Sequence, residues 1–217
     1  MAIDPLGLGR RERHSLLNGM VGPRPIAWVS SLASDGAPNL APFSFFNVFA
    51  IDPPTIAIGP GSRRGVNKDT IVNVRASGEF VVNLVSRELA ERANASSGEW
   101  GPEVDEWEVA GVTPVASDLV APPRVLESPG ALECRVRQVI ELGEAGRSTN
   151  SLIIAWVVRA HVVEGGFEAG LVDSDVLDLV GRMGGDEWCT TRDRFALRRP
   201  SSDDPAEVAA ERVRPSS

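Results

Sequence analysis

The stretch RPIAWVSSLASDGAPNLAPFSFFN, residues 24–47, decides the class of fold. Its first part, Arg24 to Leu32, is apolar and partly β-branched, which is typical of a strand, and Ser34-Asp35-Gly36 after it is a turn signal between two strands. A second apolar block, residues 43–49, runs into Asp52-Pro53-Pro54, where two prolines end ladder pairing. The stretch therefore predicts antiparallel β-structure.

The rest of the chain continues this pattern of short strands with few helices. Two short helices are predicted, one at 69–76 with Asp69-Thr70 as its cap and one at 86–94, and the arm contains a third at 11–18. Residues 95–129 are rich in Gly, Pro, Ser and acid, which predicts irregular structure. Further strands are predicted at 55–59, 79–85, 131–142 and 152–163, the last two joined by a polar turn at 143–150. Five or six strands without βαβ alternation favour a mainly β antiparallel barrel with helical decoration.

Length and charge limit the class of protein. The chain has 217 residues, with 22 basic and 30 acidic side chains and a formal net charge of -8. This length suits one domain, which we expect at 23–200, between an N-terminal arm at 1–22 and a polar tail at 201–217. The acid excess argues against nucleic-acid or anionic-membrane partners, because both require a basic face.

Cysteine usage and apolar runs predict the compartment. Cys134 and Cys189 are too few for a disulfide framework, and the start of the chain lacks the apolar core of a signal peptide. The most apolar stretch, Leu152 to Val163, is far shorter than a membrane span. We therefore expect a cytoplasmic protein without a membrane anchor.

Basic residues gather in one loop despite the negative overall charge. Turn residues after Gly59 surround Arg63, Arg64 and Lys68, which is the only lysine in the chain, and a helix is predicted directly after them. Unpaired N–H groups and the positive end of a helix dipole, together with an ammonium and the hydroxyl of Thr70, suit a phosphate monoester. The alternative is a solvated basic loop.

A second candidate site is the segment from Asn39 to Asn47, in which polar and aromatic residues alternate at close range. A planar heterocycle needs flat apolar contact and hydrogen bonds at its edge, and a strand interrupted by Pro42 leaves backbone groups free for them. The alternative is that the phenylalanines are core residues, although Asn39, Ser44 and Asn47 are harder to place in a core.

Other residue types give weaker signals. His14 and His161 lie at unrelated spacings from the two cysteines, so no metal site is expected. A single histidine on a strand, such as His161, is more often structural than catalytic. The run at 176–180 is apolar and helix-like. The glycines in RMGGDEW after it, residues 182–188, permit close approach of the backbone to a ligand or to another chain, and the alternative is a plain turn. No GxSxG, P-loop or GxGxxG motif supports a hydrolase, an NTPase or a dinucleotide fold.

Taken in order, these segments resemble the flavin reductase-like, FMN-binding split-barrel family, which includes flavoredoxins and the reductase components of two-component monooxygenases. The resemblance covers residues 23–200, and its most specific part is the order NLAPFSFFN, DPP and KDT at this spacing. The matching segments are PRPIAWVSS, DGAPNLAPFSFFN, DPP, KDTIVNV, GEFVVNLV, LVAPPRVLESPGALECRV, AHV, VGRMGG and FALRRP.

The resemblance implies a six-stranded Greek-key split barrel with short flanking helices, and a homodimer that binds FMN at the subunit interface. It makes His161 the candidate catalytic residue, near the flavin and the nicotinamide. By position the resemblance implies a set of flavin-binding residues: Ser30, Ser31, Asn39, Leu40, Ala41, Ser44, Lys68, Asp69, Thr70, Arg182 and Trp188. We add Arg63 from the basic loop to this set. Two departures concern the pocket over the flavin. Trp156 lies where many relatives carry Glu in Gly-Glu-Val, and Trp188 lies where Tyr is usual.

What the resemblance implies for function is an NAD(P)H:flavin oxidoreductase. It would take hydride from NADH or NADPH onto FMN and pass reduced flavin or electrons to a partner monooxygenase or to oxygen. The two tryptophans motivate an alternative, an FMN-dependent oxygenase or electron carrier with tightly held FMN and little NAD(P)H reductase activity. A non-enzymatic split-barrel binding module is the third alternative, and the presence of Asn39, Ser44, Lys68 and Thr70 argues against it.

Overall fold

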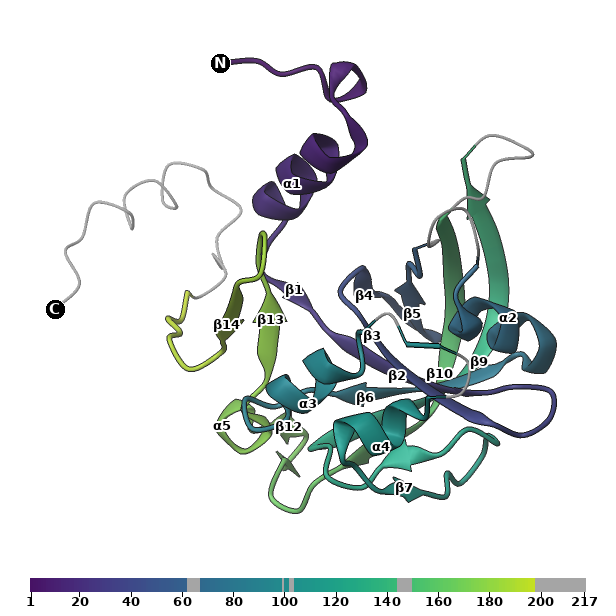
Figure 1. Cartoon of the computed structure of the whole chain (residues 1–217). Helices are drawn as coiled ribbons and strands as arrows, with labels where there is room; N and C mark the ends of the chain where they lie inside the picture. The colour runs from purple at the N-terminus through teal and green to yellow at the C-terminus, as the bar shows by residue number, and fades with distance from the viewer. Residues whose placement is uncertain (62–66, 99, 102–103, 144–149, 198–217) are drawn as a thin grey trace, which may run out of the picture.

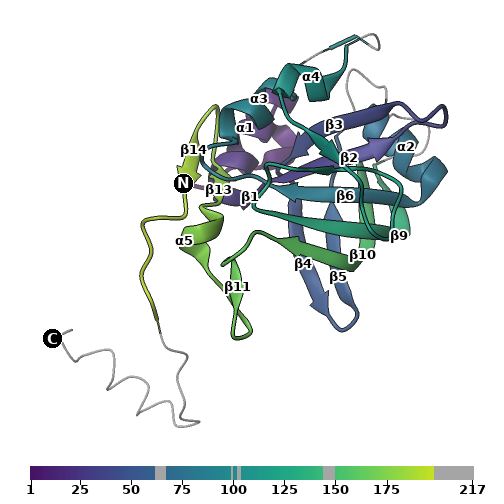
Figure 2. The ribbon, with the colours of Figure 1, turned by 90° about the horizontal axis from the view of Figure 1, so that it is seen from below.

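A computed structural model of the chain describes residues 1–61, 67–98, 100–101, 104–143 and 150–197. Its largest element is an antiparallel seven-stranded sheet in the order β3-β2-β6-β9-β10-β5-β4 (Figure 1). The strands are β2 Ala27–Leu32, β3 Pro38–Phe43, β4 Phe46–Ile51, β5 Pro54–Ile58, β6 Glu79–Leu84, β9 Gly130–Leu142 and β10 Asn150–Val162. Seen from below, β4 and β5 cross the direction of β2 and β6 (Figure 2), so the sheet curls round.

The strand count differs from the six that the resemblance implied, because residues 38–58 form three strands in the described structure. The sequence predicted one apolar block at 43–49 and missed β3, which contains Pro38 and Pro42. Proline cannot donate to a ladder and is tolerated on an edge strand, and β3 is one edge of the sheet.

The turn between β2 and β3 has the predicted chemistry. Gly36 has φ +89°, the left-handed region that favours glycine, and Asp35 Oδ1 accepts a hydrogen bond from the N–H of Ala37 at 3.0 Å. The N–H of Ala33 donates to the carbonyl of Ala37 at 2.9 Å and closes the hairpin. The turn places Asn39 opposite Ser31 in register.

The core divides between the two faces of the sheet. Side chains alternate along a strand, so Ala27 and Val29 of β2 face one cluster and Trp28 faces the other. The first cluster includes Ile71 and Val74 of helix α2 (Asp69–Ser77). The second includes residues of α3 (Ala90–Ala95) and α4 (Glu106–Ala110). Helix α2 therefore covers one face of β2 and β3, and α3 and α4 cover the other.

The ends of the described chain meet in a second, three-stranded sheet, β1-β13-β14. A buried arginine, Arg24, joins them, since its guanidinium donates to the carbonyls of Asn18, Val21 and Met183. The elements involved are η1 Pro5–Gly7, α1 Arg10–Met20, β1 Arg24–Pro25, β13 Val180–Arg182 and β14 Trp188–Thr190.

Three local predictions need correction. The helix expected from Ser86 begins at Ala90, because residues 86–89 form a bridge to Leu179 and a turn. The excursion at 95–129 contains regular structure, namely α4 and the ribbon of β7 Pro114–Val115 and β8 Arg124–Val125. The apolar run 176–180 divides between α5 Ser174–Leu177 and β13, with a ribbon of β11 Phe167–Glu168 and β12 Leu171–Val172 before it.

Some predictions fall outside the described residues: most of the 143–150 turn, the tail, and the basic loop positions 62–66. Among the helices that the structure describes, none is both long and apolar enough to cross a membrane.

Candidate functional site

The N-terminus of α2 lies beside the polar ends of β2 and β3. Helix α2 begins at Asp69 with Lys68 as its N-cap, one or two residues before the predicted cap, and ends at Gly78, whose φ of +71° suits a glycine C-cap. The hydroxyl of Thr70 in the first turn accepts a hydrogen bond from Asn39 Nδ2 at 3.0 Å.

A buried polar network continues from this contact. Ser31 Oγ accepts from Asn73 Nδ2 at 3.1 Å and lies 3.5 Å from Asn39 Nδ2. We call Ser31, Asn39, Lys68, Thr70 and Asn73 the α2 cluster. Its serine, threonine and asparagines are buried, and buried polar groups need partners, so these bonds hold α2 against the sheet.

Lys68 adds positive charge at the edge of the cluster. Its Nζ lies 5.1 Å from the centroid of the Phe43 ring. The first N–H groups of a helix have no intrahelical acceptor, so Asp69 and Thr70 present N–H donors in the same place. Hydroxyl, ammonium and backbone donors at a helix N-terminus are the donor set of a phosphate monoester, so these residues fit an FMN phosphate.

Predicted residues of β2 and β3 fall on both faces of the sheet. Ala41 shares the face of Asn39 and packs against the first core cluster. Ser30 and Leu40 face the other way. Ser30 Oγ donates to the carbonyl of Pro123 at 2.5 Å, and Leu40 is buried in the second core cluster. On the face of the sheet that α2 covers, Ser30 and Leu40 can therefore contribute only their backbone groups to a ligand.

Glu106 is a residue near the α2 cluster that sequence reasoning missed. Burial raises the pKa of its carboxyl, and the nearby charges of Asp69 and Asp105 add to this, against hydrogen bonds from its own backbone N–H and that of Leu40. The carboxyl therefore lies between the edge strand β3 and the start of α2. The available signal was Asp105, whose carboxylate accepts from the N–H of Trp107 and caps α4.

A second group of predicted residues lies at the three-stranded sheet. Ser44 Oγ accepts a 3.4 Å hydrogen bond from Arg24 Nε, and the guanidinium of Arg182 lies 5.5 Å from the centroid of the Trp188 ring. A cavity of about 350 Å³ adjoins Trp188 between α3 and β14. Its lining combines one aromatic ring, one cation and polar groups: Arg87, Ala90, Glu91, Asn94, Val180, Trp188, Cys189 and Thr190.

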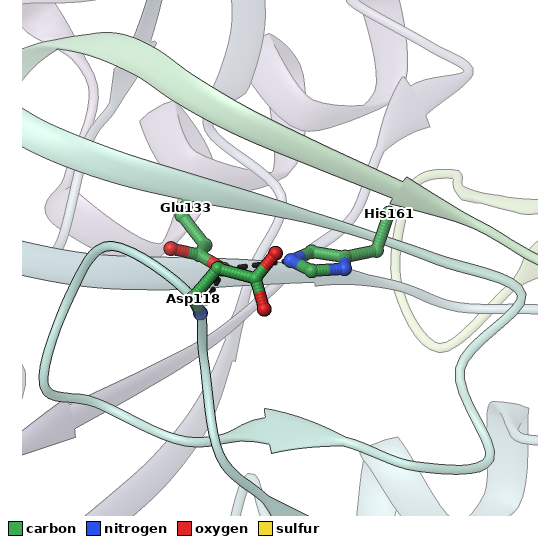
Figure 3. A group of neighbouring side chains, drawn as sticks. All are labelled: Asp118, Glu133 and His161. Carbon is green, nitrogen blue, oxygen red and sulfur yellow. Dashed lines mark hydrogen bonds and ion pairs between the residues drawn. The ribbon is translucent and has the colours of Figure 1, made fainter.

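His161 lies apart from both groups within one chain. It stands opposite Ala131 of β9, and β9 and β6 separate its strand from β2, which corresponds to roughly 14 Å at about 4.8 Å per strand. Its Nε2 lies 2.6 Å from Glu133 Oε1 (Figure 3). Glu133, Val81 and Ser30 are opposite one another in register, so this pair is on the face that is opposite to the α2 cluster.

Asp118 joins this pair, so the chain places three metal-type ligands together that no spacing in the sequence indicated. One ligand atom from each of Asp118, Glu133 and His161 lies within 4.8 Å of the others. The carboxylate oxygens of Glu133 already accept from His161 and from the N–H groups of Asp118 and Leu119. Hydrogen bonding therefore accounts for this arrangement.

Two remaining predictions concern Trp156 and Arg63. Trp156 is 41% exposed on β10 and lies under the guanidinium of Arg137, at 5.4 Å from the ring centroid, and it does not line the cavity beside Trp188. Arg63 lies outside the described residues. For all the predicted site residues, a role toward flavin or nicotinamide stays a prediction.

Comparison with solved structures gives high similarity over nearly the whole chain. Component B of nitrilotriacetate monooxygenase from Bacillus cereus is 32% identical with a TM-score of 0.87, covering 91% of this chain and 98% of that chain. The 2-nitrobenzoate 2-nitroreductase of Pseudomonas fluorescens is 32% identical with a TM-score of 0.85, covering 95% and 100%.

A third similarity concerns the fold alone. A structure from Shewanella frigidimarina with a split barrel domain is 21% identical with a TM-score of 0.79, covering 90% of this chain and 96% of that chain. The predicted class, a mainly β split barrel, is thereby confirmed. Residues 21–176 match the model of the flavin reductase like domain. This match spans well over half of the chain, and we conclude that the protein belongs to the flavin reductase-like family.

Proposed function

We propose that the protein binds FMN with its phosphate at the N-terminus of α2, and that it is an NAD(P)H:flavin oxidoreductase. The observation that carries this proposal is the α2 cluster, in which a buried amide and hydroxyl network adjoins the only lysine of the chain. The flavin, once bound and reduced, would supply electrons to a monooxygenase partner, as the name of the Bacillus cereus relative suggests, or to oxygen.

Each residue type has a task that its position allows. Lys68 supplies the charge that neutralises the phosphate, and Thr70 and the first N–H groups of α2 supply directional donors. Asn39, held by Thr70, adds an amide at the edge strand β3, whose outer backbone groups have no partner strand in the sheet. Ala41 and Phe43 follow along β3 and offer apolar contact for the ring system, and Ser44, directly after β3, offers a hydroxyl.

When bound, FMN supplies two-electron chemistry, accepting a hydride and passing its electrons on. The protein's part is to hold the flavin and the nicotinamide face to face and to exclude water. We assign His161 to the nicotinamide side, and we place Arg182 and Trp188 near the flavin. Because His161 is distant from the α2 cluster within one chain, this assignment requires that a second subunit complete the site.

A homodimer is therefore part of the proposal. Edge strand β4 supports it, since Phe45, Val48, Phe49 and Ile51 are all largely exposed there. Large exposed apolar patches mark interaction surfaces, and β4 is the free edge of the sheet opposite β3. A cytoplasmic location, where NAD(P)H is available, also belongs to the proposal.

A direct test compares two variants of α2. Lys68→Ala should weaken FMN binding roughly tenfold, because it removes one charge from the phosphate site at constant fold. Arg75→Ala is the matched control, since Arg75 lies in the last turn of the same helix and pairs with Glu141. FMN fluorescence titration measures both affinities, and NADH and NADPH oxidation with FMN measures turnover. Turnover no faster than that of free flavin would refute the reductase.

A second candidate function has its own observation. The cavity beside Trp188 has both a cation, Arg87, and an aromatic ring in its lining, which suits an aromatic anion, and the Pseudomonas fluorescens relative is named a nitroreductase. In this alternative FMN stays tightly bound and an organic acceptor or oxygen receives the electrons. FMN that remains with the protein through gel filtration, together with negligible NAD(P)H turnover, would favour it over the reductase.

A further inference from the structure

The carboxylate of Glu133 is held from three sides. Glu133 lies on β9 with a fully buried side chain. Its Oε1 accepts from the N–H of Asp118 at 2.7 Å and its Oε2 from the N–H of Leu119 at 2.6 Å. His161 Nε2, at 2.6 Å from Oε1, completes the set (Figure 3). A buried carboxylate with three partners cannot turn, so the imidazole is held as well.

The charge state of Glu133 decides where the imidazole proton lies. Burial raises the pKa of this carboxyl, but the N–H of Asp118, the His161 imidazole and the N–H of Leu119 together bring it below its usual value. An ionised carboxylate accepts only, so Nε2 must donate. In the neutral imidazole, Nδ1 then carries a lone pair and points away from Glu133.

The surroundings leave the side chain of His161 partly accessible. The side chain of His161 is 20% exposed, whereas that of Glu133 is fully buried. The other charged groups facing the pair are Asp118, and Arg159, which lies 3.5 Å from the Asp118 carboxylate and offsets its charge. The atom that His161 offers to a ligand is therefore a hydrogen-bond acceptor.

We infer that Glu133 is a positioning residue that holds His161 as the Nε2–H tautomer, so that Nδ1 accepts a hydrogen bond from the carboxamide NH₂ of the nicotinamide. The inference rests on the proposed function for its ligand, and on the described contacts for its geometry. It assigns no proton transfer to His161. The histidine recognises and orients the dinucleotide, and the hydride transfer that a bound flavin would support needs no acid or base from this side chain.

Binding of a divalent cation by Asp118, Glu133 and His161 is the competing use of the same atoms. It would require a lone pair on Nε2, which the short contact to Glu133 Oε1 opposes, and it would displace donors from Glu133. Nitrogen NMR separates the two, because a cation on Nε2 moves the proton to Nδ1.

The first experiment reads the tautomer directly. The chain has only two histidines, so ring ¹⁵N spectra at pH 8 contain two sets of signals, which His14→Asn assigns. We expect His161 to be protonated on Nε2 in the wild type and to become a mixture of tautomers in Glu133→Gln, whose amide can also donate. Glu79→Gln is the matched control. Its carboxylate accepts from the N–H of Ala121 in the same loop at 3.0 Å without touching His161.

The second experiment reads the nicotinamide contact. Reduced 3-acetylpyridine adenine dinucleotide lacks the carboxamide NH₂, so the wild type should prefer NADH over it. The ratio of the two kcat/KM values should fall roughly tenfold in Glu133→Gln and in His161→Phe, and should hold in Glu79→Gln. The difference in reduction potential between the two dinucleotides cancels when variants are compared.

The outcomes separate the inference from the function on which it rests. A wild type that oxidises neither NADH nor NADPH refutes the proposed function and the nicotinamide contact, while the ¹⁵N spectra still decide whether Glu133 sets the tautomer. Normal turnover with an unchanged tautomer, or an unchanged preference ratio, in a folded Glu133→Gln protein overturns the inference. Protonation of His161 on Nδ1 in the wild type overturns it as well.

Discussion

At the scale of single residues, the buried polar side chains depend most strongly on their hydrogen-bond partners. Asn39, Thr70 and Asn73 are buried where no bulk water can replace a lost partner, and an unpaired group there costs about 1–3 kcal/mol. Ser31 serves two amides at once, so one change affects both β3 and α2. Thr70 is thus both a residue that holds α2 against the sheet and one that we propose to bind the flavin phosphate.

Thr70→Val tests whether Thr70 both holds α2 against the sheet and binds the flavin phosphate. Valine keeps the shape of threonine but removes the hydroxyl that accepts from Asn39, so we expect a loss of about 1–2 kcal/mol in the free energy of unfolding by urea. FMN affinity should fall roughly tenfold, because the donor hydroxyl is lost and Asn39 is no longer held. Thr55→Val, whose exposed hydroxyl bonds only to the carbonyl of Pro53, is the control. Equal FMN affinities in the two variants would show that Thr70 has no role in flavin binding.

Glu133 should make the free energy of unfolding depend on pH. Its pKa is lowered in the folded chain, so its contribution is present above the unfolded value of about 4.3 and is lost as the pH falls through the lower folded value. We expect Glu133→Gln to be less stable than the wild type by about 2–3 kcal/mol near pH 7, and the gap to narrow below about pH 4. Urea unfolding at pH 7, 5 and 3.5 measures it. A gap that does not change with pH would show that the carboxylate charge is not what stabilises the loop.

At the scale of elements, attachment of helix α1 depends on one arginine. Arg24 is buried, and burial together with the nearby Arg182 lowers its pKa. Three carbonyls compensate, of which those of Asn18 and Val21 lie at the end of α1 and that of Met183 follows β13. Arg24 therefore helps to fasten the arm to the far end of the described chain, where Gly184 also packs closely against Gly19 of α1.

Arg24→Met removes the three bonds to these carbonyls, and the weaker bond to Ser44 Oγ, while keeping an apolar stem. We expect α1 to open more often, and limited trypsin digestion at Arg10, Arg11 and Arg13 to become at least tenfold faster, equivalent to about 1.4 kcal/mol of local stability. The Arg24–Pro25 bond is not itself a trypsin site, so no site is lost. Arg92→Met, which removes a surface contact to the carbonyl of Gly111, is the control. Identical digestion of both variants would show that α1 is held by other contacts.

The strands that form continuous apolar runs between turn signals could be predicted from the sequence. Strands β2, β6, β9 and β10 are apolar runs bounded by turn signals, and each lies close to its predicted range. Strand β3 was not predicted because it contains two prolines, which are tolerated in a strand at the edge of a sheet. Which strand lies at an edge is known only once the sheet is assembled. Helix α3 begins late because Ser86 pairs with Leu179, a contact across more than ninety residues of sequence.

At the scale of the whole molecule, the site that we propose draws on segments that are far apart in the sequence. The turn between β2 and β3 and the start of α2 at Lys68 to Thr70 are each local and could be predicted, whereas the contact between Asn39 and Thr70 spans 31 residues and was implied only by the resemblance. His161 and Glu133 meet only through the register of β9 and β10, which no single-residue spacing encodes. The separation of His161 from the α2 cluster follows from the three strand spacings between β2 and β10 and from their opposite faces of the sheet, so we expect a second chain to complete the site.

The exposed edge strand β4 is the surface that we expect this second chain to cover. Phe49→Asp places a charge among Phe45, Val48 and Ile51, and burying an unpaired carboxylate in an apolar contact is unfavourable. Light scattering after gel filtration should give twice the 23.2 kDa chain mass for the wild type and a mass near that of one chain for the variant. Leu171→Lys, at an exposed leucine of the β11–β12 ribbon, should leave the dimer intact.

Flavin binding extends this test to the site itself. If β4 joins subunits around the flavin, Phe49→Asp should weaken FMN binding even though Phe49 lies outside the α2 cluster, and raising the protein concentration should partly restore it. A monomeric variant that binds FMN as tightly as the wild type would place the whole flavin site within one chain. A wild type that is monomeric at all concentrations would contradict the dimer and, with it, the assignment of His161 to a flavin held at the α2 cluster.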